Sequence, residues 1–132
     1  MGLIDWDPKF ETGLESVDEQ HRFLFKVINQ HFNAMQKSKG IAETSRTLIA
    51  LKSYAQFHFI EEEQLMQHHR YSRLQDHVRL HRIWVEKVAE MEQHEIEGSF
   101  LVSIEILRFM KDWITNHIEV EDGAFGTFMK KH

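Results

Sequence analysis

Apolar residues, with a few polar ones among them, recur along this chain at steps of three and four. This is the spacing of the buried face of an α-helix. Four such stripes follow one another, and no alternating run that would indicate a β-strand competes with them. The stripe positions are Val17, His21, Leu24, Ile28, His31 and Met35, then Leu48, Leu51, Ala55, His58, Glu62 and Leu65, then Leu74, His77, His81, Trp84, Val88 and Met91, and finally Val102, Ile106, Met110, Trp113, His117 and Val120. The pattern predicts four helices of similar length.

Glycine and proline indicate where these helices begin and end, because helix interiors avoid both residues. The tract between Gly40 and Gly98 has no such breaker and is much longer than its neighbours, so it predicts two helices with a turn near residues 68–72. Short connections favour antiparallel neighbours, and we expect an all-α, up-down-up-down antiparallel four-helix bundle in which residues 1–132 form a single domain. The expected helices cover roughly residues 18–38, 41–65, 71–94 and 99–121, after a non-helical N-terminal arm.

The composition excludes several classes of function. The chain has 16 basic and 21 acidic residues and a formal net charge of -5, which argues against binding to nucleic acid. No apolar run approaches the roughly 20 residues that span a bilayer, and the first residues do not resemble a signal peptide. The absence of cysteine excludes disulfides, thiolate metal sites and iron–sulfur clusters. We expect a cytoplasmic protein that does not insert into membranes, and the acidic surface favours a monomer.

Polar side chains occupy stripe positions that a bundle normally gives to leucine. Burying such groups without partners costs several kcal/mol, so a partner must satisfy them. The residues are His21, His58, Glu62, His77, His81 and His117, together with Asp122 at the end of the last stripe. His31 lies about three turns away from His21, and we expect it to be a hydrogen-bonded core histidine or a partly exposed one.

The spacing of these residues brings some of them together within a helix. His77 and His81 are four residues apart, as are His58 and Glu62, so both side chains of each pair point the same way. His117 and Asp122 are five apart, which a regular helix would separate by about 140°. We therefore expect the last helix to end near Gly123 and to let Asp122 turn back toward the other residues.

The residues also agree in height along the predicted bundle. His21 and His58 lie at nearly equal distances from the turn at Gly40, and His81 and His117 lie at nearly equal distances from the next glycine turn. Any single pair has an ordinary interpretation as a solvated helix face. We expect core packing for Trp84 and Trp113. We expect solvent exposure for Glu61 and Glu63. Seven groups at one height instead predict a metal site.

Five imidazoles and two carboxylates are too many for one ion, since Zn²⁺ takes four ligands. Imidazole indicates iron, copper, nickel or zinc rather than Mg²⁺ or Ca²⁺. Two octahedral irons bridged by both carboxylates and an oxo or hydroxo group would use this set and leave one position open. A histidine-rich site with one vacancy suits reversible O2 binding. We expect no enzyme, because no base, nucleophile or phosphate loop accompanies the site.

Motifs spread over the whole chain carry a family resemblance. They are Trp6 and Gly13, Val17-Asp18-Glu19-Gln20-His21, Tyr54, His58-Phe59-Ile60-Glu61-Glu62, Met66, His77 and His81, and His117-Ile118 with Asp122. On these motifs the chain resembles the hemerythrin family in its bacterial single-domain branch, the bacteriohemerythrins. It differs from many members in having Ser72 where they have proline. Gly123-Ala124-Phe125 also follows Asp122, which predicts a less regular C-terminal segment.

The resemblance implies a centre of two iron ions (Fe2+/Fe3+). Glu62, Asp122 and an oxo or hydroxo group would bridge the ions. One iron would be held by His77, His81 and His117, and the iron with the vacancy, where O2 binds, by His21 and His58. The family's oxygen pocket falls on Leu24, Phe59, Trp113, Ile114 and Ile118.

The expected function is reversible O2 binding in transport, storage or delivery. O2 is the expected partner, together with an oxygen-consuming enzyme or a signalling protein. Three alternatives stay open. The first is an oxygen sensor acting through a partner, and the second is a di-iron oxidase, peroxidase or nitric-oxide-handling enzyme. The third is a metal-storage or zinc-binding helical protein without oxygen chemistry.

Overall fold

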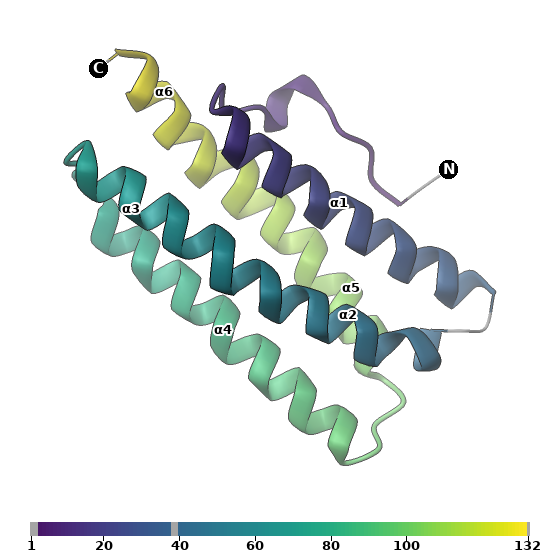
Figure 1. Ribbon diagram of the computed structural model, residues 1–132. Helices are drawn as coiled ribbons and strands as arrows, with labels where there is room; N and C mark the ends of the chain where they lie inside the picture. The colour runs from purple at the N-terminus through teal and green to yellow at the C-terminus, as the bar shows by residue number, and fades with distance from the viewer. Residues whose placement is uncertain (1–2, 38–39, 132) are drawn as a thin grey trace.

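The structure is a computed structural model that describes residues 3–37 and 40–131. Four helical rods pack side by side as an up-down-up-down bundle, and the described residues contain no β-strand (Figure 1). The predicted all-α fold is thereby confirmed. The first rod is α1 (Glu15–Gln36), the second joins α2 (Gly40–Tyr54), η2 (Ala55–Phe59) and α3 (Ile60–His68), the third is α4 (Leu74–Ile96), and the fourth joins α5 (Val102–Trp113), η3 (Ile114–Asp122) and α6 (Gly123–Lys131).

The turns between the rods lie close to the predicted places. After α3, Arg70 adopts a left-handed conformation with φ of 55°, and the backbone N–H of Tyr71 donates to the Met66 carbonyl at 2.9 Å. After α4, Gly98 has φ of 83°, which glycine adopts without steric cost. The first rod begins at Glu15, earlier than predicted. Its predicted end at residue 38 lies outside the described residues.

The fourth rod corrects two predictions. It neither ends near residue 121 nor becomes irregular afterwards, because Gly123 is helical with φ of -60° and α6 continues to Lys131. Phe125 of α6 is buried in a small cluster with Met66 and Tyr71. The burial of this aromatic side chain outweighs the helix-propensity cost of glycine, which is roughly 1 kcal/mol.

The N-terminal arm runs along α1 and is non-helical except for η1 (Pro8–Phe10), a short turn that the prediction lacked (Figure 1). Asp18 anchors the arm, because its carboxylate accepts from the backbone N–H and the hydroxyl of Thr12 at 2.9 and 2.8 Å. The arm also touches the fourth rod. A Cβ on Gly126 would lie 2.4 Å from the Thr12 carbonyl oxygen, so only glycine fits at this crossing.

The apolar core has two parts. The larger part fills most of the bundle and includes Leu24 and Ile118, and the smaller part is the cluster around Phe125 at the other end. The predicted polar side chains lie along the rods between these two parts. No helix within the described ranges has the length and apolar character needed to cross a membrane.

Candidate metal centre

All seven predicted ligand residues lie in one buried layer of the bundle, and none is more than 4% exposed. They come from all four rods: His21 from α1, His58 from η2, Glu62 from α3, His77 and His81 from α4, and His117 and Asp122 from η3. The layer therefore depends on the assembled bundle.

The seven residues form two groups that could each hold an ion. One consists of Glu62, His77, His81 and His117, and the other of His21, His58, Glu62 and Asp122. Within each group, the ligand atoms lie within 4.8 Å of one another. Glu62 belongs to both groups, so the two positions are adjacent.

Each carboxylate presents one oxygen to each group of histidines. Glu62 Oε1 lies 2.9 Å from His77 Nε2 and 3.1 Å from His81 Nε2, whereas its Oε2 lies 3.3 Å from His58 Nε2. Asp122 divides in the same way. Its Oδ1 lies 2.6 Å from His77 Nε2, and its Oδ2 lies 2.9 Å from His21 Nε2. Each carboxylate could therefore contact an ion at both positions.

The backbone of the fourth rod explains how Asp122 reaches the layer. The segment η3 is a π-helix, whose hydrogen bonds join residues five apart instead of four. His117 and Asp122 are five apart and therefore face the same way. The expected helix end near Gly123 was wrong. The wider turn of the π-helix, and not a helix end, brings Asp122 to the same side as His117. A second π-helical segment, η2, carries His58.

Buried polar atoms in this layer fit a cation. The imidazole Nε2 atoms of His21 and His58 face each other at 3.2 Å, so at most one proton lies between them. Within the described part of the chain, both ring nitrogens of His117 and one oxygen of each carboxylate, Glu62 Oε2 and Asp122 Oδ2, form no hydrogen bond of good geometry. A cation between the converging lone pairs would satisfy the two carboxylate oxygens and Nε2 of His117.

The electrostatics of the layer couple metal binding to proton release. Burial and the charge of Asp122 would raise the pKa of Glu62, but hydrogen bonds from His58, His77 and His81 outweigh them and hold this pKa well below its usual value. Burial would lower the pKa of His77, but its contacts with the two carboxylates raise it to about 10. His77 therefore carries a proton that an incoming metal ion must displace.

The five predicted oxygen-pocket residues, Leu24, Phe59, Trp113, Ile114 and Ile118, are all buried in the larger core cluster. Two of them stack on histidines of the layer. The ring of Phe59 is parallel to His81 with centroids 3.9 Å apart, and Trp113 stacks on His117 at 4.0 Å. Trp113 thus contacts the layer as well as packing in the core. Trp84 is fully buried, as expected.

Sequence reasoning missed four residues beside the layer. Glu61 and Glu63 were expected to be solvated, but Glu63 Oε2 accepts from His81 Nδ1 at 2.6 Å and Glu61 Oε2 accepts from the Gln20 amide at 2.7 Å. Gln20 Oε1 in turn accepts from His58 Nδ1. The signal for Glu61 and Glu63 was an unbroken run of three glutamates that begins three residues after His58.

Tyr54 is the fourth missed residue. It belongs to the motifs of the resemblance, but no role was predicted for it. Its ring stacks on His58 with centroids 4.7 Å apart. Its buried hydroxyl has no hydrogen-bond partner among the described residues, and burial raises its pKa well above the usual value.

Two histidines outside the layer have other partners. His31 is fully buried and hydrogen-bonded through both ring nitrogens, to Thr47 Oγ1 and the Ser103 carbonyl, each at 2.9 Å. The predicted core role of His31 is confirmed. His94 forms a partly exposed group with Glu90 and Glu105. The ammonium of Lys87, 3.0 Å from Glu105, already supplies a positive charge there.

Comparisons with known proteins agree on one family. The family model described as Hemerythrin HHE cation binding domain matches residues 12–128, a range that contains the whole layer. A bacteriohemerythrin from Stenotrophomonas maltophilia (strain R551-3) is 29% identical over 132 residues, covering 100% of this chain and 85% of that protein. A bacteriohemerythrin from Clostridium acetobutylicum is 31% identical over 127 residues, with coverages of 93% and 98%. A myohemerythrin from Theromyzon tessulatum is 32% identical over 117 residues, with coverages of 89% and 86%.

Proposed function

This chain belongs to the hemerythrin family, and on that premise we propose that it binds O2 reversibly at a centre of two iron ions. One observation supports the proposal above all others. Glu62 and Asp122 each direct one oxygen to the histidines of one group and the other oxygen to the histidines of the second group. Two ions bridged by two carboxylates would use every one of these atoms.

We assign the ligands as follows. His77, His81 and His117 would hold one iron, and His21 and His58 the other, with Glu62, Asp122 and an oxo or hydroxo group between them. The unequal number of histidines leaves an open position on the second iron, where O2 would bind. Iron in this set would supply electrons that pass reversibly to O2.

The surrounding side chains favour binding over turnover. Leu24, Phe59, Trp113, Ile114 and Ile118 would exclude water and protons from the open position, and this exclusion slows irreversible oxidation. Both buried carboxylates of the layer face histidines, so in the loaded centre they would serve as ligands and not as proton donors. We therefore propose transport, storage or delivery of O2, to an oxygen-consuming enzyme or a signalling partner, in place of catalysis.

The test is a visible spectrum of the protein reconstituted with Fe2+ under anaerobic conditions, combined with metal analysis. We expect two irons per chain and a colourless form that gains a charge-transfer band with O2 and loses it when O2 is removed. A single irreversible passage to a ferric spectrum, with turnover by added reductant, would favour the di-iron enzyme. One zinc per chain would contradict the proposal.

A further inference from the structure

The histidines of the layer differ on the side that faces away from the carboxylates. His81 donates its Nδ1 proton to Glu63 Oε2 at 2.6 Å. His58 donates to the amide oxygen of Gln20, whose own amide donates to Glu61 at 2.7 Å. Within the described part of the chain, the Nδ1 atoms of His21 and His117 have no hydrogen-bond partner. Each group thus contains a histidine whose Nδ1 has a side-chain partner, His81 in one group and His58 in the other.

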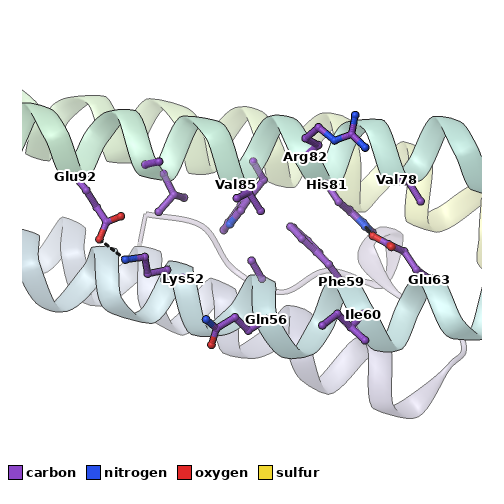
Figure 2. Close-up of a pocket in the computed structure, with 14 residues that line it drawn as sticks. Lys52, Gln56, Phe59, Ile60, Glu63, Val78, His81, Arg82, Val85 and Glu92 are labelled. Carbon is purple, nitrogen blue, oxygen red and sulfur yellow. Dashed lines mark hydrogen bonds and ion pairs between the residues drawn. The ribbon is translucent and has the colours of Figure 1, made fainter.

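Glu63 reaches His81 at the edge of a surface groove. The groove has a volume of about 470 Å³ and lies between the second and third rods, with Phe59 and Trp84 among its lining residues. Figure 2 shows the Glu63 carboxylate meeting the His81 ring in the space between two helices, with Phe59 beside them. The Glu63 side chain is 31% exposed and that of His81 only 3%. Glu63 therefore lies between the buried ring and solvent.

The residues that accept the Nδ1 protons, Glu63 from His81 and Gln20 from His58, differ in charge. A carboxylate that accepts the outer proton of a metal-bound imidazole fixes the orientation of the ring and makes its other nitrogen a stronger ligand. A neutral amide oxygen also fixes the ring, but hydrogen bonds to an ionised acceptor are about twice as strong as neutral ones. His81 and His58 belong to different groups, so this difference would distinguish the two metal positions.

We propose that Glu63 and Gln20 are positioning residues, each for a different metal position, and that Glu63 makes the position of His77, His81 and His117 the tighter one. The three consecutive glutamates then act as one unit. Glu62 would bridge the ions, Glu63 accepts from His81 directly, and Glu61 acts on His58 through Gln20. This inference rests on the proposed two-metal centre and adds to it an order of metal affinity.

The same groove supplies a matched control. Glu92 lies at its other end, away from His81, and forms an ion pair with Lys52 at 2.9 Å, as Figure 2 shows. Glu92→Gln removes one negative charge from the groove, as Glu63→Gln does. Only the Glu63 substitution alters the partner of a predicted ligand.

The experiment is a titration of the full chain with Co²⁺ alone, in competition with a chelator. The wild type is compared with Glu63→Ala, Glu63→Gln, Gln20→Ala and Glu92→Gln. We expect two Co²⁺ per wild-type chain, with the tighter affinity weakened about 10- to 100-fold in Glu63→Ala and less in Glu63→Gln, which keeps an acceptor. We expect Gln20→Ala to weaken the other affinity, and Glu92→Gln to behave as the wild type.

Proton NMR of the Co²⁺-loaded proteins supplies a readout independent of affinity. The Nδ1 protons of coordinated histidines should appear as shifted, solvent-exchangeable signals. Glu63→Ala and Glu63→Gln should each move one of these signals, and Gln20→Ala should move a different one. Thermal unfolding of the metal-free variants checks that each is folded. If Glu63→Ala is not folded, the comparison rests on Glu63→Gln.

Three results would overturn the inference. The first is a Glu63→Gln protein with wild-type affinities and spectrum, and the second is a Glu92→Gln protein that weakens binding equally. The third is that Glu63 and Gln20 affect the same metal position. A wild type that binds two ions in any of these cases leaves the proposed function standing. A wild type that binds fewer than two overturns both.

Discussion

The bundle buries histidines in two regions, and the regions differ in whether their hydrogen bonds are complete. Around His31, the hydroxyl of Thr47 and the carbonyl of Ser103 occupy both ring nitrogens. In the layer of seven residues, imidazole nitrogens face each other or face carboxylates already shared among several rings, and several polar atoms have no hydrogen bond within the described residues. The first region is complete as folded, whereas the second keeps polar atoms that a bound cation would satisfy.

The pKa values of His31 and His77 shift in opposite directions, because the neighbours of the two rings differ in charge. Burial lowers the pKa of His31, because its neutral partners do little to favour the charged ring. The pKa of His77 rises to about 10 despite burial, because two carboxylates face it. A buried histidine is therefore a candidate ligand when its neighbours are anionic and unsatisfied, and a structural residue when they are neutral and paired.

We expect the largest effect when all metal is removed, because metal should stabilise the layer and leave the region of His31 unchanged. An ion that binds only the folded chain adds roughly 4 kcal/mol of stability when its free concentration is about 1,000 times its Kd. We expect denaturant unfolding of the Fe2+-loaded protein under anaerobic conditions to shift to much lower denaturant with a chelator. The chelator should cause a similar shift in a His31→Leu variant. Superimposable curves with and without metal would show that the layer is satisfied without an ion.

Substituting a single histidine in each region should separate metal binding from packing. His77→Ala removes a ring that contacts both carboxylates, and we expect metal affinity at its position to fall at least about 100-fold. His31→Leu should keep the wild-type iron content. Metal analysis after reconstitution and desalting measures both. Full iron content in His77→Ala would make His77 a structural residue.

His31→Leu should instead reduce stability. The substitution leaves the Thr47 hydroxyl and the Ser103 carbonyl without their partner, and an unsatisfied buried group costs about 1–3 kcal/mol. Urea unfolding of the metal-free wild type and variant measures the difference. A variant as stable as the wild type would show that these hydrogen bonds contribute nothing net.

The smallest expected effect is a pH dependence of opposite sign at His31 and at His77. The pKa of His31 is lowered from 6.5, so below this value the unfolded chain binds a proton that the folded chain does not, and stability falls with falling pH. The pKa of His77 is raised, so its contribution in the metal-free protein is full below 6.5 and is lost as the pH rises toward 10.

The measurement is urea unfolding of the metal-free protein between about pH 5 and about pH 10. The stability difference between the wild type and His31→Leu should shrink as the pH falls from about 7 to about 5, by at most roughly 1.4 kcal/mol per pH unit. The difference between the wild type and His77→Ala should change only on the alkaline side. A constant difference for His31→Leu would contradict a neutral His31.

The bundle was predictable because its apolar stripes are long and regular, and the layer because polar residues interrupt every stripe at one height. The π-helical segment η3 was not, since nothing local distinguishes it from an α-helix, and the contacts of Asp122 with the other rods favour it. Gly123 has the local character of a helix end, but Phe125 finds a buried place in contact with Met66 and Tyr71, two positions distant in sequence.

The contacts of Glu63 and Gln20 with the histidines could not be predicted for a similar reason. Glu63 faces a neighbouring rod, and the period of one helix does not show which residue of the next helix it meets. The stripe positions predict one nitrogen of His81 as a metal ligand but do not show which residue the second nitrogen contacts. The same is true of His58 and Gln20, which contact each other from different rods.

The wider turn of η3 also affects how this chain can change in length. A π-helical turn holds an extra residue, so deleting one residue between His117 and Asp122 would let the segment relax to an ordinary α-helix. The two ligands would then be four residues apart, a spacing that places both side chains on the same face of an α-helix. The later side chains would keep their orientation toward the bundle, because the deleted residue is the one that the wider turn accommodates. The same deletion in a regular α-helical rod would instead rotate every later side chain by about 100°.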